Sequence, residues 1–306
     1  MSEYLLPLVD RREIADGTMA FWFDTTGTDF LFTAGQYASF TLPNFGEQNL
    51  GGFTPETDAE GNKRDFSIVS SPSELSPNKS SEDKPHKFPH IMIATRMFTL
   101  PKPGEGRRDT AFKRNLRNMP LGTKIRISAP MGSFVLHPHT HAVGVGVNKN
   151  ADRPALFLVG GIGITPIRSI IADATHRKLP HKLMLIYSNR TVASTAFLAE
   201  FEEWAKENQN FLFIPTITDS PASVSPGEIV AGGQPKGWTH EVGRITEPML
   251  RTHLNRLLSP TVPNSYSLSP IAYLVGPPAF VSAMLPIAEH VGIDPDNIRT
   301  EEFAGY

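Results

Sequence analysis

The chain has 306 residues, of which 40% are hydrophobic and 20% are charged, so it can bury a sizeable core and is long enough for about two domains. Its formal net charge of −2 does not favour a broad nucleic-acid surface. The absence of cysteine excludes disulfides, thiolate-bound clusters or zinc sites, and cysteine nucleophiles. No apolar segment has the length of a signal peptide core or of a membrane span, so we expect a cytoplasmic protein.

The first part of the chain, up to about residue 136, is typical of short strands separated by turns. The expected strands are TMAFWFDT, ASFTLP, RDFSIVSS, HIMIATRMF and KIRISAP, which are rich in β-branched and aromatic residues. This pattern predicts an antiparallel barrel or sandwich. One helix is expected at DTAFKRNLRNMP, where Phe112, Leu116 and Met119 recur at helical spacing. Segments 44–63 and 75–89 are expected to be surface loops.

The second part of the chain has a different pattern of apolar residues. The runs ALFLV, LMLIY, FLFIPTI and IAYLV are continuously apolar, as strands buried on both faces are. Helical stretches are expected between them at 166–176, 195–208 and 246–258, so the pattern predicts βαβ units and a parallel sheet. We therefore expect one domain over residues 1–140, a linker over 141–153 and a second domain over 154–306. No pattern explains the length of the Ser/Pro/Gly-rich loop at 219–244.

The stretch FLVGGIGITPIRS joins the first of these apolar strands to a helix. Thr165 is a good N-cap and Pro166 a good first helical residue, and a helix N-terminus favours phosphate. Gly160, Gly161 and Gly163 let the backbone turn tightly and let a ligand approach it closely. The stretch therefore predicts either a site for a phosphorylated ligand or a turn that needs glycine for steric reasons alone. Its spacing matches neither Gly-x-Gly-x-x-Gly nor a Walker loop.

A second signal lies in RDFSIVSSPSE, in the first part of the chain. Arg64 and Ser67 are suited to hold an anion and the edge of a ring, while Phe66 offers an aromatic face. By itself this signal is weak, because alternating polar and aromatic residues are ordinary in strands.

Six short segments in order along nearly the whole chain resemble the ferredoxin–NADP reductase superfamily. They are RDFS, which matches the family's Arg-x-Tyr-Ser flavin motif, RRDTAFKRNL with APMGSF, GGIGITP, YSNR, LVGPPAF and the terminal EEFAGY. The resemblance implies a flavin-binding antiparallel β-barrel domain followed by a nucleotide-binding α/β domain with a parallel sheet. It also implies FAD as the flavin, although the residues alone do not separate FAD from FMN.

On the flavin side, the resemblance implies that Arg64 pairs with the pyrophosphate and that Phe66, where the family usually has Tyr, covers one face of the ring system. Ser67 would donate a hydrogen bond towards the flavin N5. The remaining flavin contacts that we expect are Ser70, Ser71 and Thr110. The alternatives are a surface salt bridge for Arg64, a core aromatic for Phe66 and a plain helix cap for Thr110.

On the nucleotide side, the resemblance implies that Gly161, Gly163 and Thr165 hold the pyrophosphate of the nicotinamide nucleotide. The nicotinamide site is expected at Gly276, Pro277 and Pro278, with Phe280 packed behind it. Many relatives have cysteine before this Gly-Pro pair, whereas this chain has Val275, so no thiol contributes here.

Ser188 and Arg190 follow the second parallel strand, where the family contacts the adenosine ribose. NADH-specific enzymes often place an acidic residue there, and none occurs before Glu200. The sequence therefore leans weakly to NADPH over NADH, with Arg190 pairing the 2′-phosphate. The alternative is that Arg190 stacks on adenine or lies in solvent.

At the C-terminus, the resemblance implies that an aromatic residue covers the second face of the flavin and moves aside for nicotinamide. We favour Phe303 over Tyr306. Glu302, with Glu301, is expected to relay protons or else to be a solvated acidic pair. The expected catalytic residues are Ser67, Phe303 and Glu302.

Two further features are weaker. His137, His139 and His141 alternate, but this polar segment does not predict a metal site. A basic cluster is suited either to docking a small acidic electron-transfer protein or to being a solvated helix face. Its members are Lys102, Arg107, Arg108, Lys113, Arg114 and Arg117.

The sequence therefore predicts an FAD-dependent NAD(P)H oxidoreductase that passes electrons to a separate acceptor, such as a ferredoxin, a flavodoxin or an oxygenase component. One alternative is direct reduction of a small oxidant: a ferric chelate, a quinone or free flavin. Another is a flavin-holding regulatory or electron-routing subunit of a larger complex.

Overall fold

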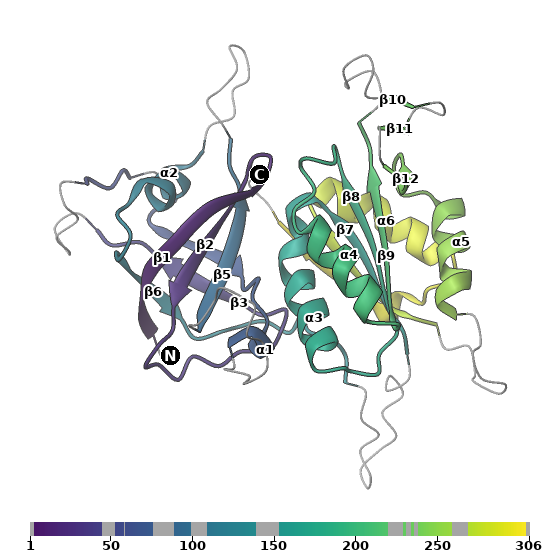
Figure 1. The fold of residues 1–306 in the computed structure, drawn as a ribbon, viewed down its shortest axis with the longest axis horizontal. Coiled ribbons are helices and arrows are strands. Elements are labelled where there is room, and N and C mark those ends of the chain that lie inside the picture. The colour runs from purple at the N-terminus through teal and green to yellow at the C-terminus, as the bar shows by residue number, and fades with distance from the viewer. Residues whose placement is uncertain are drawn as a thin grey trace, which may run out of the picture. The chain divides into compact units, whose positions relative to one another are not determined.

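The computed structural model describes residues 3–44, 53–57, 59–75, 89–98, 109–138, 153–219, 229–230, 234–235, 238–258 and 269–303. It divides into two compact units (Figure 1). The first comprises Met1–Val135 with Thr165–His176, and the second comprises Leu136–Ile164 with Arg177–Tyr306. Most of the expected linker lies outside the described residues, so the domain boundaries stay a prediction. No helix in the described ranges is long and apolar enough to cross a membrane.

The first unit is built on a six-stranded antiparallel sheet in the order β4-β3-β6-β1-β2-β5. Its strands are β1 (Glu3–Ala15), β2 (Thr18–Asp24), β3 (Tyr37–Thr41), β4 (Lys63–Ser67), β5 (His90–Arg96) and β6 (Lys124–Ser128). The chain after β4 bonds to β5, because the N–H of Val69 donates to the carbonyl of Met92 at 2.8 Å. This bond joins the two ends of the strand order and curls the sheet, so the predicted barrel-like antiparallel fold is confirmed.

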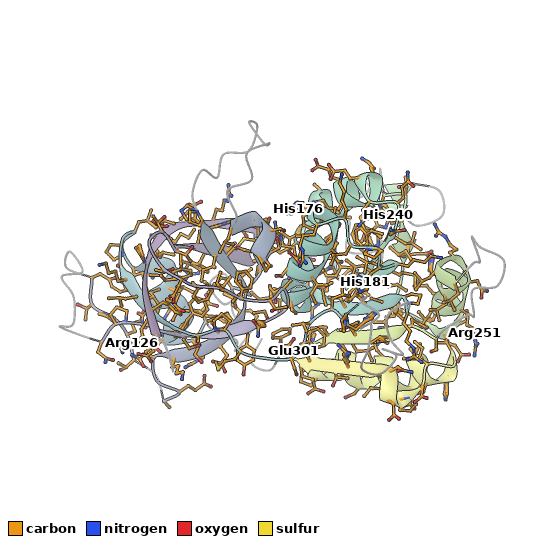
Figure 2. All side chains as sticks on the ribbon, turned by 90° about the horizontal axis from the view of Figure 1, so that it is seen from below. Arg126, His176, His181, His240, Arg251 and Glu301 are labelled. Atoms are coloured by element: carbon orange, nitrogen blue, oxygen red, sulfur yellow. The ribbon has the colours of Figure 1, made fainter. Side chains whose placement is uncertain are left out.

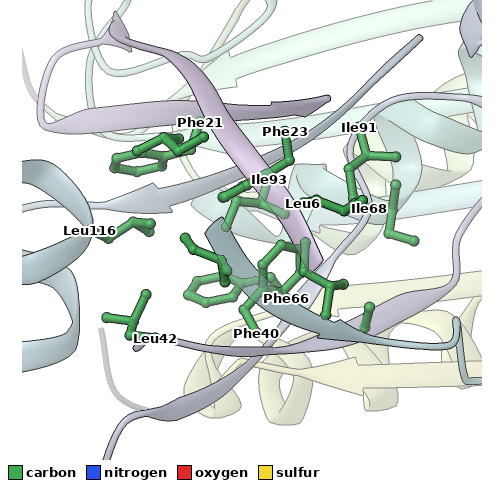
Figure 3. Close-up of a cluster of buried hydrophobic side chains, with 14 of the residues drawn as sticks. Leu6, Phe21, Phe23, Phe40, Leu42, Phe66, Ile68, Ile91, Ile93 and Leu116 are labelled. Carbon is green, nitrogen blue, oxygen red and sulfur yellow. The ribbon is translucent and has the colours of Figure 1, made fainter. Parts of the chain in front are cut away.

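Alternating side chains of these strands form the core of the first unit (Figure 3). Pairs two residues apart, such as Phe21 with Phe23 and Ile91 with Ile93, are fully buried, as the two-residue period of a strand requires. Helix α2 (Ala111–Asn118) adds Phe112, Leu116 and Met119, each 1% exposed. The helix predicted from the spacing of these three residues is therefore confirmed. A short helix, α1 (Pro72–Leu75), follows β4.

The second unit contains a six-stranded parallel sheet in the order β12-β9-β8-β7-β13-β14. Its strands are β7 (Ala155–Gly160), β8 (Leu183–Asn189), β9 (Phe211–Ile217), β12 (Glu241–Val242), β13 (Ile271–Gly276) and β14 (Ile298–Glu302). Every residue of β7 and β13 is buried, which explains their continuously apolar sequences. The predicted parallel α/β fold is confirmed. Within the unexplained 219–244 loop, β10 (Ile229–Val230) pairs with β11 (Gln234–Pro235).

The helices begin at somewhat different places from those predicted. They are α3 (Ile164–His176), α4 (Leu198–Glu207), α5 (Glu247–Leu258) and α6 (Pro278–His290), with 3-10 turns η1 (Gly161–Gly163) and η3 (Pro295–Asn297). The prediction of Thr165 as N-cap is wrong, because η1 runs directly into α3 and places Thr165 in the first turn. Helix α4 begins later than predicted, because Thr195 bonds back to Thr191 and Phe197 adopts a left-handed φ of 61°.

Candidate functional site

Strand β4 carries the flavin motif, and its two faces differ. Arg64 and Phe66 pair with Phe40 and Ala38 of β3, so they share the face that points into the barrel core. Phe66 is 6% exposed, and its ring lies 5.6 Å from Phe40 and 5.7 Å from Phe112. The structure thus gives Phe66 the contacts of a core aromatic, and its role as a flavin cover stays a prediction.

Ser67 lies at the end of β4, and its hydroxyl is buried. The residue is 4% exposed, and its Oγ is buried without a hydrogen-bond partner among the described residues. A buried hydroxyl that makes no hydrogen bond is unfavourable, and such groups are rare in folded proteins. A ligand that offers an acceptor at this position satisfies the hydroxyl, so Ser67 fits the expected contact with a flavin.

The Arg64 guanidinium lies 5.5 Å from the Phe112 ring and is held by the loop before β4. Its Nη1 donates to the carbonyl oxygens of Glu60, Gly61 and Lys63, and its Nη2 lies 2.8 Å from the Glu60 carboxylate. The Glu60 side chain is 71% exposed, and ion pairs of this kind are weak and exchange readily. A shallow, open depression of about 330 Å³ lies beside Arg64 and is also lined by Ser39, Lys63 and Asp65.

The N-terminal end of α2 adds positive charge near Arg64. Thr110 caps this helix, as expected, because its Oγ1 accepts from the N–H of Lys113 at 3.4 Å. Lys113 is 7% exposed, and its ammonium donates to the carbonyl of Arg96 at 3.0 Å. Burial lowers the pKa of Lys113, Asp109 acts against this, and Arg64 lowers the pKa further. Two cations and a helix N-terminus together suit a diphosphate.

Other members of the predicted basic cluster are engaged by acidic side chains. The Arg114 Nε donates to Glu56 at 2.9 Å, and the Arg117 guanidinium lies 3.3 Å from Asp109. Lys102, Arg107 and Arg108 lie outside the described residues. A docking surface for an acidic partner therefore stays a prediction that the described part of the cluster does not strengthen.

The hydroxyls of Ser70 and Ser71 are used within the protein. The Ser70 Oγ accepts from the N–H of Met92 at 2.7 Å and donates to the carbonyl of His90 at 3.2 Å. The Ser71 Oγ lies 2.8 Å from the Ser73 Oγ. These bonds fix the chain that follows β4, while the expected contacts of both serines with flavin stay predictions.

In the second unit, the glycine-rich loop packs tightly against the Gly-Pro turn. A Cβ on Gly160 would lie 2.8 Å from the ring of Phe280, and one on Gly163 would lie 2.7 Å from the carbonyl oxygen of Val275. A Cβ on Gly276 would meet the same Phe280 ring at 3.0 Å. Gly160 and Gly163 are therefore required by packing, as the steric alternative states.

Gly161 differs from its neighbours. Its φ is +53°, and a Cβ there would meet nothing within 4 Å. It is the glycine of this loop whose backbone faces open space, so it best fits the expected contact with the nucleotide pyrophosphate. Thr165 is 3% exposed in the first turn of α3, and its expected contact, like that of Gly163, stays a prediction.

The carboxyl ends of β8 and β9 bring together residues that lie far apart in sequence. Ser188 pairs with Gly160 on one side and Thr216 on the other, and the exposed Arg190 follows directly after β8. The N–H of Asp219 donates to the carbonyl of Arg190 at 2.9 Å. The backbone of Asp219, an acidic residue, therefore lies beside that of Arg190 at the carboxyl end of the sheet. The sequence prediction considered only acidic residues that follow β8 and so did not include Asp219.

At the C-terminal strand, neighbouring glutamates differ in environment. Glu301, labelled in Figure 2, pairs with Val275 in the sheet register. Its Oε2 is buried without a hydrogen-bond partner among the described residues. Burial raises the pKa of Glu301 to about 7. Glu302 is exposed, and the N–H of the half-buried Phe303 donates to the carbonyl of Gly276 at 3.0 Å.

The proton-relay prediction therefore fits Glu301 better than Glu302, because a carboxyl group with a pKa near neutrality can both hold and release a proton. The expected nicotinamide residues Pro277 and Pro278 are exposed where α6 begins, beside the Gly276 turn. The role of Phe303 as a flavin cover stays a prediction. Tyr306 lies outside the described residues.

His137 is occupied in structural hydrogen bonds. Its Nε2 lies 2.8 Å from the carbonyl of Arg153, and its Nδ1 lies 3.1 Å from the hydroxyl of Tyr273. Both ring nitrogens thus have protein partners, while His139 and His141 lie outside the described residues. Within the described ranges, no group of three or more His, Asp or Glu side chains is placed to hold a metal ion.

Comparison with known proteins is consistent with this geometry. The family model for the oxidoreductase NAD-binding domain matches residues 157–285. One component of the Na(+)-translocating NADH-quinone reductase of Methylococcus capsulatus is 26% identical over 217 residues, which are 70% of this chain and 46% of that protein. The chain therefore spans about half the length of this relative.

Solved structures share the whole architecture. The cytochrome b5 reductase domain of Ulva prolifera nitrate reductase superposes with a TM-score of 0.65 at 16% identity, covering 98% of this chain and 97% of that one. A ferredoxin NADP+ reductase from Neisseria gonorrhoeae superposes with a TM-score of 0.62 at 14% identity, covering 99% of both. At these identities the structures establish the fold.

Four observations indicate the same kind of protein, a two-unit reductase module. They are the barrel-like sheet, the parallel α/β unit, the matched NAD-binding domain and the sequence relatives. FAD and NAD(P)H are the cofactors typical of proteins with this arrangement. The chain therefore contains an oxidoreductase NAD-binding domain over residues 157–285, and its fold is that of ferredoxin–NADP reductase-type modules.

Proposed function

We propose that this chain takes electrons from a nicotinamide nucleotide, holds them on bound FAD and passes them to a separate acceptor. The observation that carries the proposal is the buried hydroxyl of Ser67, which has no hydrogen-bond partner within the described part of the chain and lies at the end of the strand that bears the flavin motif. Bound FAD would supply the chemistry that the side chains lack, namely acceptance of a hydride and release of single electrons.

The residues of the first unit bind and orient the flavin. Arg64 and the N-terminal end of α2, capped by Thr110, hold the diphosphate through charge-assisted hydrogen bonds. Lys113 adds a buried positive charge to the same region. Ser67 donates to the polar edge of the ring system and so fixes its position.

The residues of the second unit bind the coenzyme. The open backbone at Gly161 receives the pyrophosphate, and the turn at Gly276 and Pro277 shapes the nicotinamide site. Glu301, with a pKa of about 7, holds or releases a proton near neutral pH. Phe303 covers the flavin until the nicotinamide takes its place.

The proposal also concerns which coenzyme, NADH or NADPH, the chain uses. Arg190 favours the 2′-phosphate of NADPH, which is the reason for the lean to NADPH from sequence. Asp219 favours the free ribose diol of NADH, because a carboxylate accepts hydrogen bonds from hydroxyls and repels a phosphate. With both groups at this edge of the sheet, NADH becomes the stronger candidate. The Methylococcus capsulatus relative is likewise named as part of an NADH-quinone reductase.

The acceptor is a separate molecule or domain, because these 306 residues contain no cysteine to hold an iron–sulfur cluster. The names of the similar proteins include a ferredoxin reductase and part of a quinone reductase, so a redox protein and a quinone are the first acceptors to test.

The decisive experiment starts from the purified protein. Its flavin is released and identified, and the loaded protein is mixed with NADH or NADPH in a stopped-flow instrument. Rapid loss of the oxidised-flavin absorbance supports the proposal, and absence of flavin binding refutes it. Binding with very slow reduction favours a regulatory subunit instead. Fast steady-state reduction of ferric chelates or quinones without a protein partner favours a direct reductase.

A further inference from the structure

Helix α3 is bonded to the chain that follows the flavin motif, within the first unit. The Arg168 Nη1 donates to the carbonyl of Val69 at 3.1 Å, and the Ser169 Oγ donates to the carbonyl of Ser70 at 2.6 Å. On its other side, the same chain bonds to β5 through the N–H of Val69. Side chains of α3 therefore satisfy carbonyl oxygens that a further strand would otherwise satisfy.

An ion pair extends this contact. The Arg168 guanidinium meets both carboxylate oxygens of Glu74, with distances of 2.8 and 2.9 Å. The Arg168 side chain is 7% exposed, and the N–H of Ser71 donates to the Glu74 Oε2 at 2.6 Å. Burial raises the pKa of Glu74, but Arg168 and the Ser71 N–H more than offset this, so the pKa lies below its usual value. The pair is therefore charged at neutral pH, and its forked geometry fixes both partners.

A third contact lies near the other end of the helix. The Nδ1 of His176, labelled in Figure 2, lies 3.2 Å from the Ser73 Oγ. Helix α3 thus meets the Val69–Glu74 segment over most of its length. That segment begins two residues after Ser67, whose hydroxyl is expected to meet the flavin. At its N-terminal end, α3 is continuous with the turn Gly161–Gly163, where the nucleotide is expected.

We propose that Arg168 and Ser169 are positioning residues that couple the flavin site to the nucleotide loop, so that filling one site raises the affinity of the other. Neither residue is placed to touch a cofactor; each acts through the backbone that it holds. A flavin that orders the chain around Ser67 also orders the Val69–Glu74 segment and, through it, the start of α3. By linkage, bound nucleotide strengthens flavin binding by the same factor. This inference rests on the proposed function.

The test compares flavin-loaded and flavin-stripped protein. Calorimetric titration with NAD+ and with NADP+ gives the dissociation constant of each form for the coenzyme that binds more tightly. For the wild type we expect the loaded form to bind at least about fivefold more tightly than the stripped form, the lower end of typical coupling. The double variant Arg168→Met/Glu74→Gln should bring this ratio to about one, and Ser169→Ala should lower it in part.

The double variant is chosen because replacing both members of a buried ion pair is tolerated far better than removing one. The matched control is Arg126→Met/Glu3→Gln, which removes an exposed pair of the same unit and should keep the wild-type ratio. A ratio of one in the wild type, or a wild-type ratio in both the double variant and Ser169→Ala, overturns the coupling. Failure of the wild type to bind flavin or coenzyme at all overturns the proposed function instead.

Discussion

The backbone N–H of Asp219 donates to the carbonyl of Arg190 over 2.9 Å, so a carboxylate and a guanidinium follow neighbouring strands at one edge of the parallel sheet. In the proposed nucleotide site, the two groups would act in opposite directions. A guanidinium at Arg190 attracts a 2′-phosphate, whereas a carboxylate at Asp219 repels it and accepts hydrogen bonds from a ribose diol. We therefore propose that coenzyme choice depends on which of the two groups has the stronger effect.

Replacing Asp219 by Asn should improve the use of NADPH by about fivefold or more, because two unit charges 4 Å apart in a solvated site interact by about 1 kcal/mol. Replacing Arg190 by Ala should weaken NADPH selectively. Stopped-flow reduction of the flavin by NADH and NADPH measures both effects. Glu203→Gln, an exposed change on α4, is the control and should alter neither rate. If the NADPH-to-NADH ratio of Asp219→Asn equals that of the wild type, the carboxylate does not read the ribose.

Replacing Ser67 by Ala should weaken flavin binding by about two- to tenfold, the effect of losing one neutral hydrogen bond of about 0.5–1.5 kcal/mol. The flavin-free protein should lose no stability, because its Ser67 hydroxyl has no partner among the described residues. Fluorescence titration with FAD and thermal unfolding of the stripped protein provide the two measurements. Unchanged flavin affinity together with lost stability would assign the hydroxyl to the protein interior.

Replacing Arg64 by Ala should weaken flavin binding by about 10- to 150-fold, because a charge-assisted hydrogen bond contributes about 1.5–3 kcal/mol. The variant should fold, since the Glu60 partner of Arg64 is exposed and the pair adds little to stability. The flavin content of the purified variant and its titration with FAD measure the effect. Arg126→Ala, in the same sheet but away from the motif, is the control. Full flavin content in Arg64→Ala would contradict the assignment.

Replacing Glu301 by Gln should change how stability depends on pH. In the folded protein the pKa of Glu301 is raised to about 7 from 4.5, so the folded state binds the proton more tightly than the unfolded state does. Stability from this group is fully present below about pH 4.5 and is lost as the pH rises to about 7, by roughly 3 kcal/mol in total. Glu301→Gln should remove this loss and be more stable than the wild type at pH 8.

Urea unfolding at pH 4.5, 6 and 8 tests this expectation. The neighbouring variant Glu302→Gln is the matched control, because Glu302 is exposed and should follow the wild-type profile. If the free energy of unfolding changes with pH in the same way for wild type and Glu301→Gln, Glu301 is already charged at low pH. That result would contradict its proposed role of holding a proton near neutral pH.

Much of the fold was predictable because its strands have a clear composition. Aromatic and β-branched residues mark the strands that contain Phe21 and Ile91, and continuous apolar runs mark β7 and β13. Strands β1 and β14 and helix α6 were missed. The burial of β1 varies irregularly along its 13 residues, and β14 has a charged, edge-strand composition. Helix α6 contains Pro286, a residue that is unfavourable inside a helix, so its sequence lacks the usual helical signature.

The candidate site was predictable only as a set of segments. The motifs predict Ser67, Gly161 and Arg190 as site residues, but no pattern in the sequence reveals that the Ser67 hydroxyl lacks a partner among the described residues. Asp219 was missed because its proximity to Arg190 depends on the order of strands in the sheet. Lys113 was assigned to a surface cluster, whereas the first turn of α2 buries it. Each of these facts depends on which residues of distant segments become neighbours.

The ring of Phe280 lies against both Gly160 and Gly276. Two loops that are more than a hundred residues apart therefore cannot vary independently. A side chain at Gly160 would meet the Phe280 ring, and one at Gly276 would meet both this ring and the Gly160 backbone. For protein engineering, these three positions should be changed together or not at all. A library that diversifies the nucleotide site should hold these three positions constant. It should also keep Gly161, because its φ of +53° disfavours any side chain, and should vary the exposed Arg190 and the half-buried Ser188.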